Sequence, residues 1–172
     1  LSAYPGDARP ALDFTATAPT GKPGITFSAD YWHLYGFDVT HAGKNGFRIV
    51  RGNHNLFEFL SAVNNGNAGF QLAQGASCNI LKNCDSYYNA DAKNEDADGF
   101  APKLDVGSEN RFIGCRAWMN SDDGFDGYLR GEERDVNTYY ENCIAYKNGY
   151  LKDGKRSKGD GNGFKLGGCD KE

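Results

Sequence analysis

The sequence predicts an all-β protein folded as a parallel β-solenoid of about five to six coils. Three observations predict this fold. One short signature repeats five times, a second repeats in step with it at intervals of 23 to 31 residues, and the composition is rich in turn-forming glycine. The chain has 23 glycines and five prolines among 172 residues. A chain of this length holds one core, so we expect a single solenoid domain over residues 1–172.

The first signature is a glycine–phenylalanine pair, seen as NGFR, AGFQ, DGFA, DGFD and NGFK. Its aromatic members are Phe47, Phe70, Phe100, Phe125 and Phe164. In a solenoid, equivalent side chains of successive coils lie about 4.8 Å apart, which is the spacing between paired strands. These phenylalanines are therefore expected to form one inward-facing stack.

The second signature is an apolar or cysteine position followed five residues later by a small or amide residue. Its first members are Phe37, Leu60, Cys84, Cys115 and Cys143, and their partners are Ala42, Asn65, Asn89, Asn120 and Asn148. We expect the cysteines to be buried as free thiols and the asparagines to form a hydrogen-bonded ladder at a turn. A β-sandwich or propeller would explain ladders in a single register less well.

Two insertions interrupt the repeat at the same turn. The distance from the ladder position to the phenylalanine is five residues in three coils, but eleven from Asn89 to Phe100 and sixteen from Asn148 to Phe164. Loops on a rigid scaffold often carry function, so these insertions are candidate site elements. The alternative is neutral drift of solvent-exposed loops.

Charge and composition limit the possible partners. The formal net charge of −4 argues against nucleic acid as the main partner, and no apolar run approaches membrane-spanning length. We expect a monomer. The five cysteines form no CxxC pair, so a zinc site is not expected. No signal peptide is visible, and the start without methionine predicts a processed or truncated N-terminus.

A cluster of acidic residues stands out when it is placed on the repeat. Asp122, Asp123 and Asp126 lie within five residues, and Asp98 occupies the same position as Asp123 one coil earlier. The position of Asp126 is taken by Lys165 one coil later. Four carboxylates should thus converge on one exposed sheet edge, a set of hard oxygens suited to Ca²⁺ more than to Mg²⁺. The alternatives are turn-capping aspartates and a simple salt bridge between Lys165 and Asp126.

At this point two segments resemble a known family. DADGFAPKLDVGSENRFIGCRAWMNSDDGFDGY and GDGNGFKLGG are similar to polysaccharide lyase family 9, secreted pectate lyases built on a right-handed parallel β-helix, and the match runs from about Tyr31 to the end of the chain. Family members are longer, so the resemblance implies that this chain lacks N- and C-terminal parts of the full enzyme. It also implies primary Ca²⁺ ligands, which map to Asp98, Asp122, Asp123 and Asp126. Lys165 then corresponds to the Brønsted base.

The resemblance implies calcium-dependent cleavage of pectate, or polygalacturonate, by β-elimination outside the cell. Lysine is a base only when neutral, so its pKa has to fall or the enzyme has to work at alkaline pH. Further cations are candidate ligands for the carboxylates of neighbouring sugars: Lys103, Arg130, Lys152, Lys155, Arg156 and Lys158. A merely solvated loop is the alternative for them.

Two other functions remain open at the level of sequence. One is a polygalacturonase-like glycoside hydrolase, which needs paired carboxylates. The other is a non-catalytic carbohydrate-binding solenoid stabilised by calcium. Rhamnogalacturonan or another uronate polymer remains open as the substrate.

Overall fold

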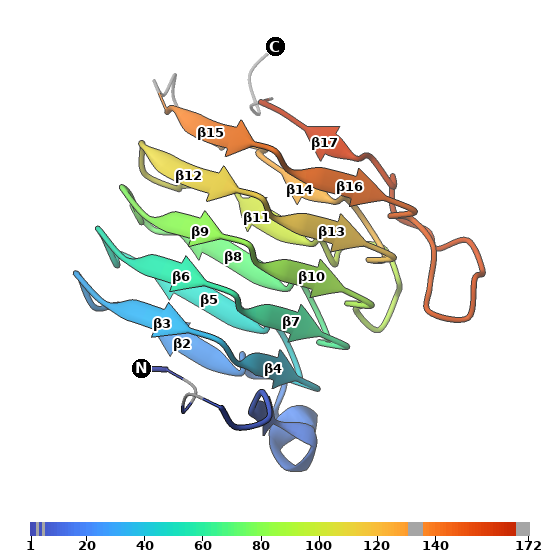
Figure 1. Ribbon diagram of the computed structural model, residues 1–172. Helices are drawn as coiled ribbons and strands as arrows, with labels where there is room; N and C mark the ends of the chain where they lie inside the picture. Colours follow the sequence, from blue (N-terminus) through green and yellow to red (C-terminus); the bar gives the residue numbers. More distant parts are fainter. Residues whose placement is uncertain (3, 5, 131–135, 168–172) are drawn as a thin grey trace.

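The computed structural model describes residues 1–2, 4, 6–130 and 136–167, and this part of the chain winds into three parallel sheets (Figure 1). The first sheet contains β1 (Ala11–Asp13), β4 (Asp38–Thr40), β7 (Ser61–Val63), β10 (Asp85–Tyr87), β13 (Arg116–Trp118) and β16 (Ile144–Tyr146). The second contains β2 (Ile25–Phe27), β5 (Phe47–Val50), β8 (Phe70–Ala73), β11 (Phe100–Pro102), β14 (Phe125–Asp126) and β17 (Phe164–Lys165). The third contains β3 (His33–Tyr35), β6 (Leu56–Glu58), β9 (Ile80–Lys82), β12 (Asn110–Ile113) and β15 (Thr138–Glu141).

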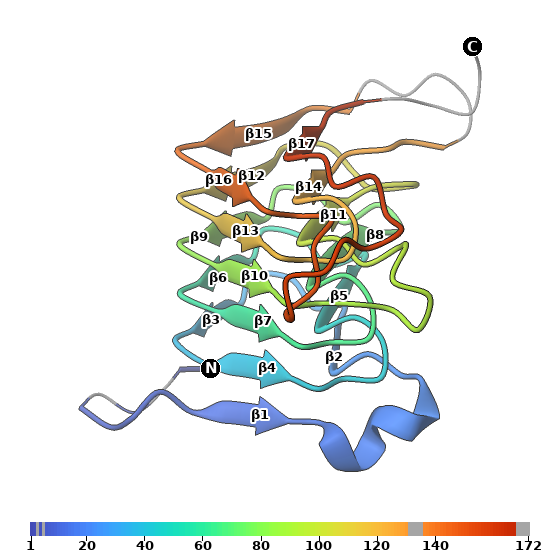
Figure 2. The ribbon, with the colours of Figure 1, turned by 90° about the vertical axis from the view of Figure 1, so that its right-hand side faces the viewer.

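Each coil passes from the third sheet to the first and then to the second, as β3, β4 and β5 do. Five such coils, the last formed by β15, β16 and β17, lie within the described residues. The predicted all-β parallel solenoid is therefore confirmed. A short 3-10 helix, η1 (Thr15–Thr20), follows β1 at the N-terminal end of the stack (Figure 2). Among the described residues, no helix has the length and apolar character needed to cross a membrane.

The predicted phenylalanine stack fills the core beside the second sheet. Successive ring centroids from Phe47 to Phe164 are 4.6, 5.1, 4.9 and 4.6 Å apart, and the rings are nearly parallel. The first four rings are completely buried. The cysteine ladder is also present, since the thiols of Cys84, Cys115 and Cys143 are free and each donates to a carbonyl of the preceding coil. The expected burial is confirmed for Cys84 and Cys115 but is wrong for Cys143, which is half-buried because it lies in the last described coil.

The asparagine ladder is confirmed as well. The Nδ2 groups of Asn65, Asn89 and Asn120 each donate to the Oδ1 of the next ladder member, at 3.0, 2.9 and 2.9 Å, and the ladder ends at Asn148. A second ladder that the sequence analysis missed joins Asn55, Asn79 and Asn110. Its members are 24 and 31 residues apart, which are intervals of the first ladder, so the signal was present in the sequence.

The ladder explains why the signature needs glycine before phenylalanine. A Cβ added at Gly99 would lie 3.0 Å from the Nδ2 of Asn120 and 2.6 Å from the carbonyl oxygen of Gly124. A side chain at that position would therefore push adjacent coils apart. Because Asp98 and Asp123 directly precede Gly99 and Gly124, this close packing also fixes the positions of both aspartates along the solenoid axis.

Replacing Asn120 by alanine is expected to lower the free energy of unfolding by about 3 kcal/mol. The change removes the oxygen that accepts from both the backbone N–H and the side-chain amide of Asn89, and it removes the amide that donates to Asn148. The buried backbone N–H of Asn89 is then left without an acceptor. Chemical denaturation measures the effect. Asn137→Ala serves as the control because Asn137 is exposed, and it should change stability by less than about 0.5 kcal/mol. Equal losses in the two variants would contradict a stabilising role for the ladder.

Candidate metal-binding and catalytic site

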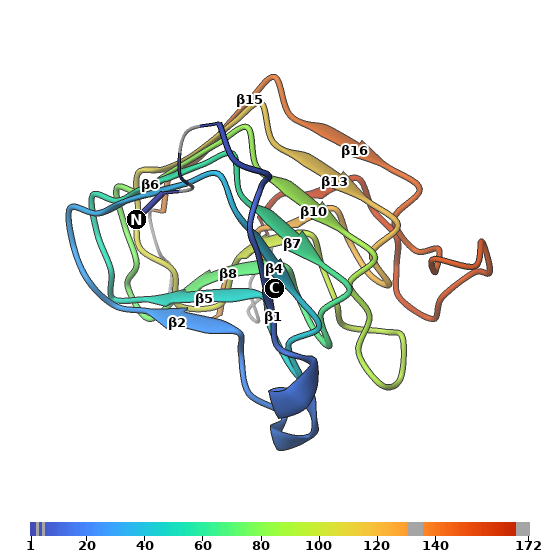
Figure 3. The same cartoon turned by 60° about the horizontal axis from the view of Figure 1, so that its bottom comes forward.

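Both insertions lie at the corner between the first and second sheets, as predicted (Figure 3). The first is organised by Asp91, whose carboxylate accepts the backbone N–H groups of Lys93, Glu95 and Asp96. The second folds back onto the first, since the N–H of Lys158 donates to the carbonyl of Asn94 at 2.8 Å. Both insertions contact the aspartates that precede β14: the N–H of Asp122 donates to the carbonyl of Ala97, and the second insertion donates to Asp122 and Asp123.

The structure brings three of the four predicted metal ligands into one group. Asp98, Asp122 and Asp123 each offer a carboxylate oxygen, and these oxygens all lie within 4.8 Å of one another. Asp126 lies next to this group on β14, and its Cα pairs with that of Lys165 on β17, as the repeat predicted. The four carboxylates of Asp98, Asp122, Asp123 and Asp126 thus come from two adjacent coils, and together they are called the acidic centre below.

The expectation that these aspartates lie on an exposed edge is wrong. Asp98 and Asp123 are completely buried, and Asp126 and Asp122 are only 2% and 9% exposed. The second insertion causes part of this burial, because the N–H of Asp160 donates to Asp122 and the N–H of Asn162 to Asp123, both at 2.8 Å.

Asn162 has a positioning role that the sequence analysis did not assign. Its side-chain amide donates to the same Asp123 oxygen that accepts its backbone N–H, at 2.9 Å. Asn162 occupies the position of Asp123 one coil later, so the repeat contained a signal for this contact.

Within the described part of the chain, two lysines face the carboxylates. The Nζ of Lys103 lies 2.7 Å from Asp98 Oδ2 and 2.6 Å from Asp126 Oδ2, so this lysine contacts the acidic centre. The Nζ of Lys165 lies 3.5 Å from Asp123 Oδ2 and 3.9 Å from Asp160 Oδ2. The ion pairs of Lys165 therefore go to Asp123 and Asp160, and the simple salt bridge with Asp126 that the sequence left open is not the observed contact.

The buried carboxylates have raised pKa values. Burial, with the charge of Asp123 second, raises the pKa of Asp122 to about 6. Burial also raises the pKa of Asp98 and of Asp123. For Lys165, burial favours the neutral amine, but the surrounding carboxylates outweigh it and raise the pKa above its ordinary value. Without a bound cation, Lys165 therefore stays protonated at neutral pH.

The donor set fits a calcium ion. Asp123 Oδ2 is buried and accepts no hydrogen bond from any described residue, although the Lys165 amine is 3.5 Å away. A buried carboxylate oxygen without a donor is costly, and a cation would satisfy it. Four carboxylates facing two ammonium groups leave a formal charge of −2, which one divalent ion balances. Several carboxylate oxygens at flexible spacing suit Ca²⁺.

The other predicted substrate ligands lie outside this centre. The guanidinium of Arg130 lies over the ring of Tyr128, 5.8 Å from its centroid, and the Lys165 amine is at the same distance from that ring. Four cations are exposed on the second insertion: Lys152, Lys155, Arg156 and Lys158. Lys155 pairs with Asp153 at 2.7 Å, and Lys152 lies over the ring of Tyr88.

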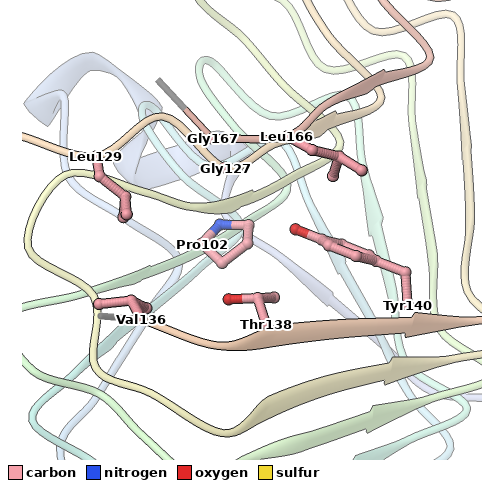
Figure 4. A pocket seen from close by; sticks show the side chains of 8 residues that line it. All are labelled: Pro102, Gly127, Leu129, Val136, Thr138, Tyr140, Leu166 and Gly167. Carbon is pink, nitrogen blue, oxygen red and sulfur yellow. The ribbon is translucent and has the colours of Figure 1, made fainter. Parts of the chain in front are cut away.

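A cavity of about 160 Å³ lies beside the strands that carry the site (Figure 4). It is lined by residues adjacent to the site in sequence, including Pro102, Gly127 and Leu166, and the hydroxyl of Tyr140 points into it. Burial raises the pKa of that hydroxyl. The lining residues carry no charge, so the cavity does not offer the counter-ions that an anionic sugar polymer needs.

The fold and the site together define a class: a parallel β-helix protein with a group of buried aspartates and a lysine beside it. The particular family follows from a family model described as "Pel9A-like, right handed beta helix region", which matches residues 1–172. The chain belongs to this family. The resemblance to polysaccharide lyase family 9 and the right-handed winding are thereby confirmed.

Known relatives and structures agree with this assignment. Pectate lyase L of Thermoclostridium stercorarium is 41% identical over 98% of this chain and 14% of its own length. Pectate lyase L of Dickeya dadantii is 44% identical over 84% of this chain and 34% of its own length. The crystal structure of pectate lyase Pel9A superimposes with a TM-score of 0.80 and 38% identity over 91% of this chain and 40% of that one. The chain thus spans less than half the length of these relatives.

Proposed function

We propose that the protein is a calcium-dependent pectate lyase. The observation that carries this proposal is the buried group of Asp98, Asp122 and Asp123 with the Lys165 amine 3.5 Å from Asp123. The relatives named pectate lyase support it. Its substrate would be an anionic polygalacturonate, and it would degrade pectin outside the cell.

The mechanism assigns separate roles to the acids and the lysine. Asp98, Asp122, Asp123 and Asp126 would hold calcium, which neutralises the uronate carboxylate and stabilises the charge that develops when C5 loses its proton. Lys165 in its neutral form takes that proton. The C5–H electron pair forms the C4–C5 double bond, and the C4–O bond breaks with the electrons leaving on the glycosidic oxygen.

The electrostatics of Lys165 connect base strength to cation binding. The same carboxylates that attract a cation raise the pKa of Lys165 and keep it protonated. A bound divalent ion compensates these charges and favours the neutral amine. Calcium and an alkaline pH should therefore act in the same direction on the rate.

The hydrolase alternative fits the site less well. An inverting glycosidase needs its two carboxyl groups roughly 6.5–9.5 Å apart, so that a water molecule fits between them. Here one carboxylate oxygen from each of Asp98, Asp122 and Asp123 lies within 4.8 Å of the others, which suits the coordination of one cation. A second candidate substrate is supported by a solved rhamnogalacturonan lyase that superimposes with a TM-score of 0.81 and 32% identity, covering 99% of this chain and 44% of that chain.

The proposal predicts cleavage of polygalacturonate with formation of an unsaturated product, and a loss of more than about tenfold in rate when EDTA removes calcium. Ultraviolet absorbance of the new double bond, measured beside the release of reducing ends, distinguishes elimination from hydrolysis. Added excess calcium should restore the rate. New reducing ends without absorbance would contradict the proposal. Faster cleavage of rhamnogalacturonan than of polygalacturonate would identify rhamnogalacturonan as the preferred substrate.

A further inference from the structure

Arg48 is an unusual cation on the outer face of the second sheet. It lies on β5 between Phe47 and Ile49, which are completely buried in the core, so its side chain projects to the opposite face. Among the arginines and lysines that the structure describes, every other one is either exposed or paired with a carboxylate, whereas Arg48 is half-buried and has no such partner. A partly desolvated guanidinium without an anion is costly.

The strand register places Arg48 in line with the acidic centre. Equivalent residues on successive strands of the second sheet form a column on its outer face. From β17 to β5 the column contains Lys165, Asp126, Ala101, Gln71 and Arg48. Figure 2 shows these strands of the second sheet one below another. Three strand spacings separate Asp126 from Arg48, which corresponds to about 14 Å along the solenoid.

The positions that carry acids in the later coils carry neutral residues around Arg48. Asn45 and Ala68 occupy the positions of Asp98 and Asp123, and Gln71 occupies that of Asp126. Asn45 is completely buried, and its Oδ1 accepts no hydrogen bond from the described residues. The column therefore changes from strongly acidic to neutral and basic over a few coils, with no carboxylate in these positions to compete for Arg48.

We propose that Arg48, with Gln71 beside it, is a second anion-binding site that holds a uronate carboxylate several sugars away from the bond that is cleaved. This inference rests on the proposed function, because it needs a polyuronate that runs along the outer face of the second sheet. The guanidinium of Arg48 can donate two parallel hydrogen bonds to the carboxylate, and the side-chain amide of Gln71 can bond a neighbouring hydroxyl. The site sets affinity for long chains and takes no part in the proton transfer.

The test compares Arg48→Gln with Arg51→Gln in a Lys165→Ala background, so that substrate is not consumed. Glutamine already occupies both equivalent positions on the next coil, as Gln71 and Gln74, so both changes suit the fold. Calorimetry with a long oligogalacturonate should show a Kd about tenfold weaker for Arg48→Gln and unchanged for Arg51→Gln. A disaccharide, too short to span about 14 Å, should bind all variants equally.

Gln71→Glu gives a second, independent test should Arg48→Gln fold poorly. It places a carboxylate directly across from Arg48, so it should leave the thermal midpoint unchanged or raised while weakening long-chain binding about tenfold or more. A structural role for Arg48 would not produce that combination. Equal long-chain affinity in all variants would overturn this inference and leave the proposed function standing. Failure of the parent protein to bind any polyuronate would overturn both.

Discussion

Replacing Lys165 by alanine is expected to reduce kcat on polygalacturonate by about a thousandfold or more, with a much smaller change in calcium affinity. A positioned general base contributes about 10²–10⁴-fold, and the half-buried Lys165 amine is held beside Asp123 at the edge of the acidic centre. Removing a positive charge from the carboxylates should leave calcium binding intact or slightly stronger. Initial rates from product absorbance and calcium titration by calorimetry measure the two effects.

Lys103 is the other lysine beside the four carboxylates and therefore the alternative candidate for the base. Burial favours its neutral form, but Asp98 and Asp126, both in contact with its Nζ, outweigh burial and raise its pKa, so Lys103 is held as a cation. Lys155→Ala is the matched control, because that amine is exposed and Asp153 is its one carboxylate partner among the described residues. Its kcat should stay within about twofold of the parent. A Lys165→Ala variant with kcat close to that of Lys155→Ala would exclude Lys165 as the base.

The repeat predicted most of the features that depend on spacing alone. The phenylalanine stack, the cysteine and asparagine ladders and the pairing of Asp126 with Lys165 all follow from the rule that equivalent residues stack on successive coils. The same rule could have identified the second ladder of Asn55, Asn79 and Asn110, and the contact of Asn162 with Asp123.

The repeat could not predict the burial of the aspartates. That burial depends on the path of two insertions that have no counterpart in the other coils, and on backbone contacts such as that from Asp160 to Asp122. The place of Lys103 depends on the reach of a long side chain from the end of β11 back to Asp98, which no periodic pattern records. These two features decide the electrostatics of the site, and both lie outside the repeat.

Repulsion between the aspartates should destabilise the metal-free protein, and the Asp122→Asn variant tests this. In EDTA above about pH 6, this variant should be more stable than the parent by about 1–2 kcal/mol. The folded state raises the pKa of Asp122 to about 6, so its ionisation destabilises the metal-free fold, and water at its partly accessible edge reduces the effect. The sign follows from linkage: the penalty is absent below the unfolded pKa near 3.8, grows as pH rises and is complete above about 6.

Calcium should reverse this order. Loss of one charged ligand should weaken calcium affinity about 100-fold or more, so that millimolar calcium stabilises the parent by mass action and the variant hardly at all. Chemical denaturation at several pH values, with EDTA and with calcium, measures both effects. Asp153→Asn is the control, since this exposed carboxylate on the second insertion pairs with Lys155 and should leave the response to calcium unchanged. If Asp122→Asn gained as much stability from calcium as the parent, Asp122 would not be a ligand. If the variant gained no stability in EDTA, the four aspartates would already be compensated by Lys103 and Lys165, and their repulsion would not be the source of the calcium affinity.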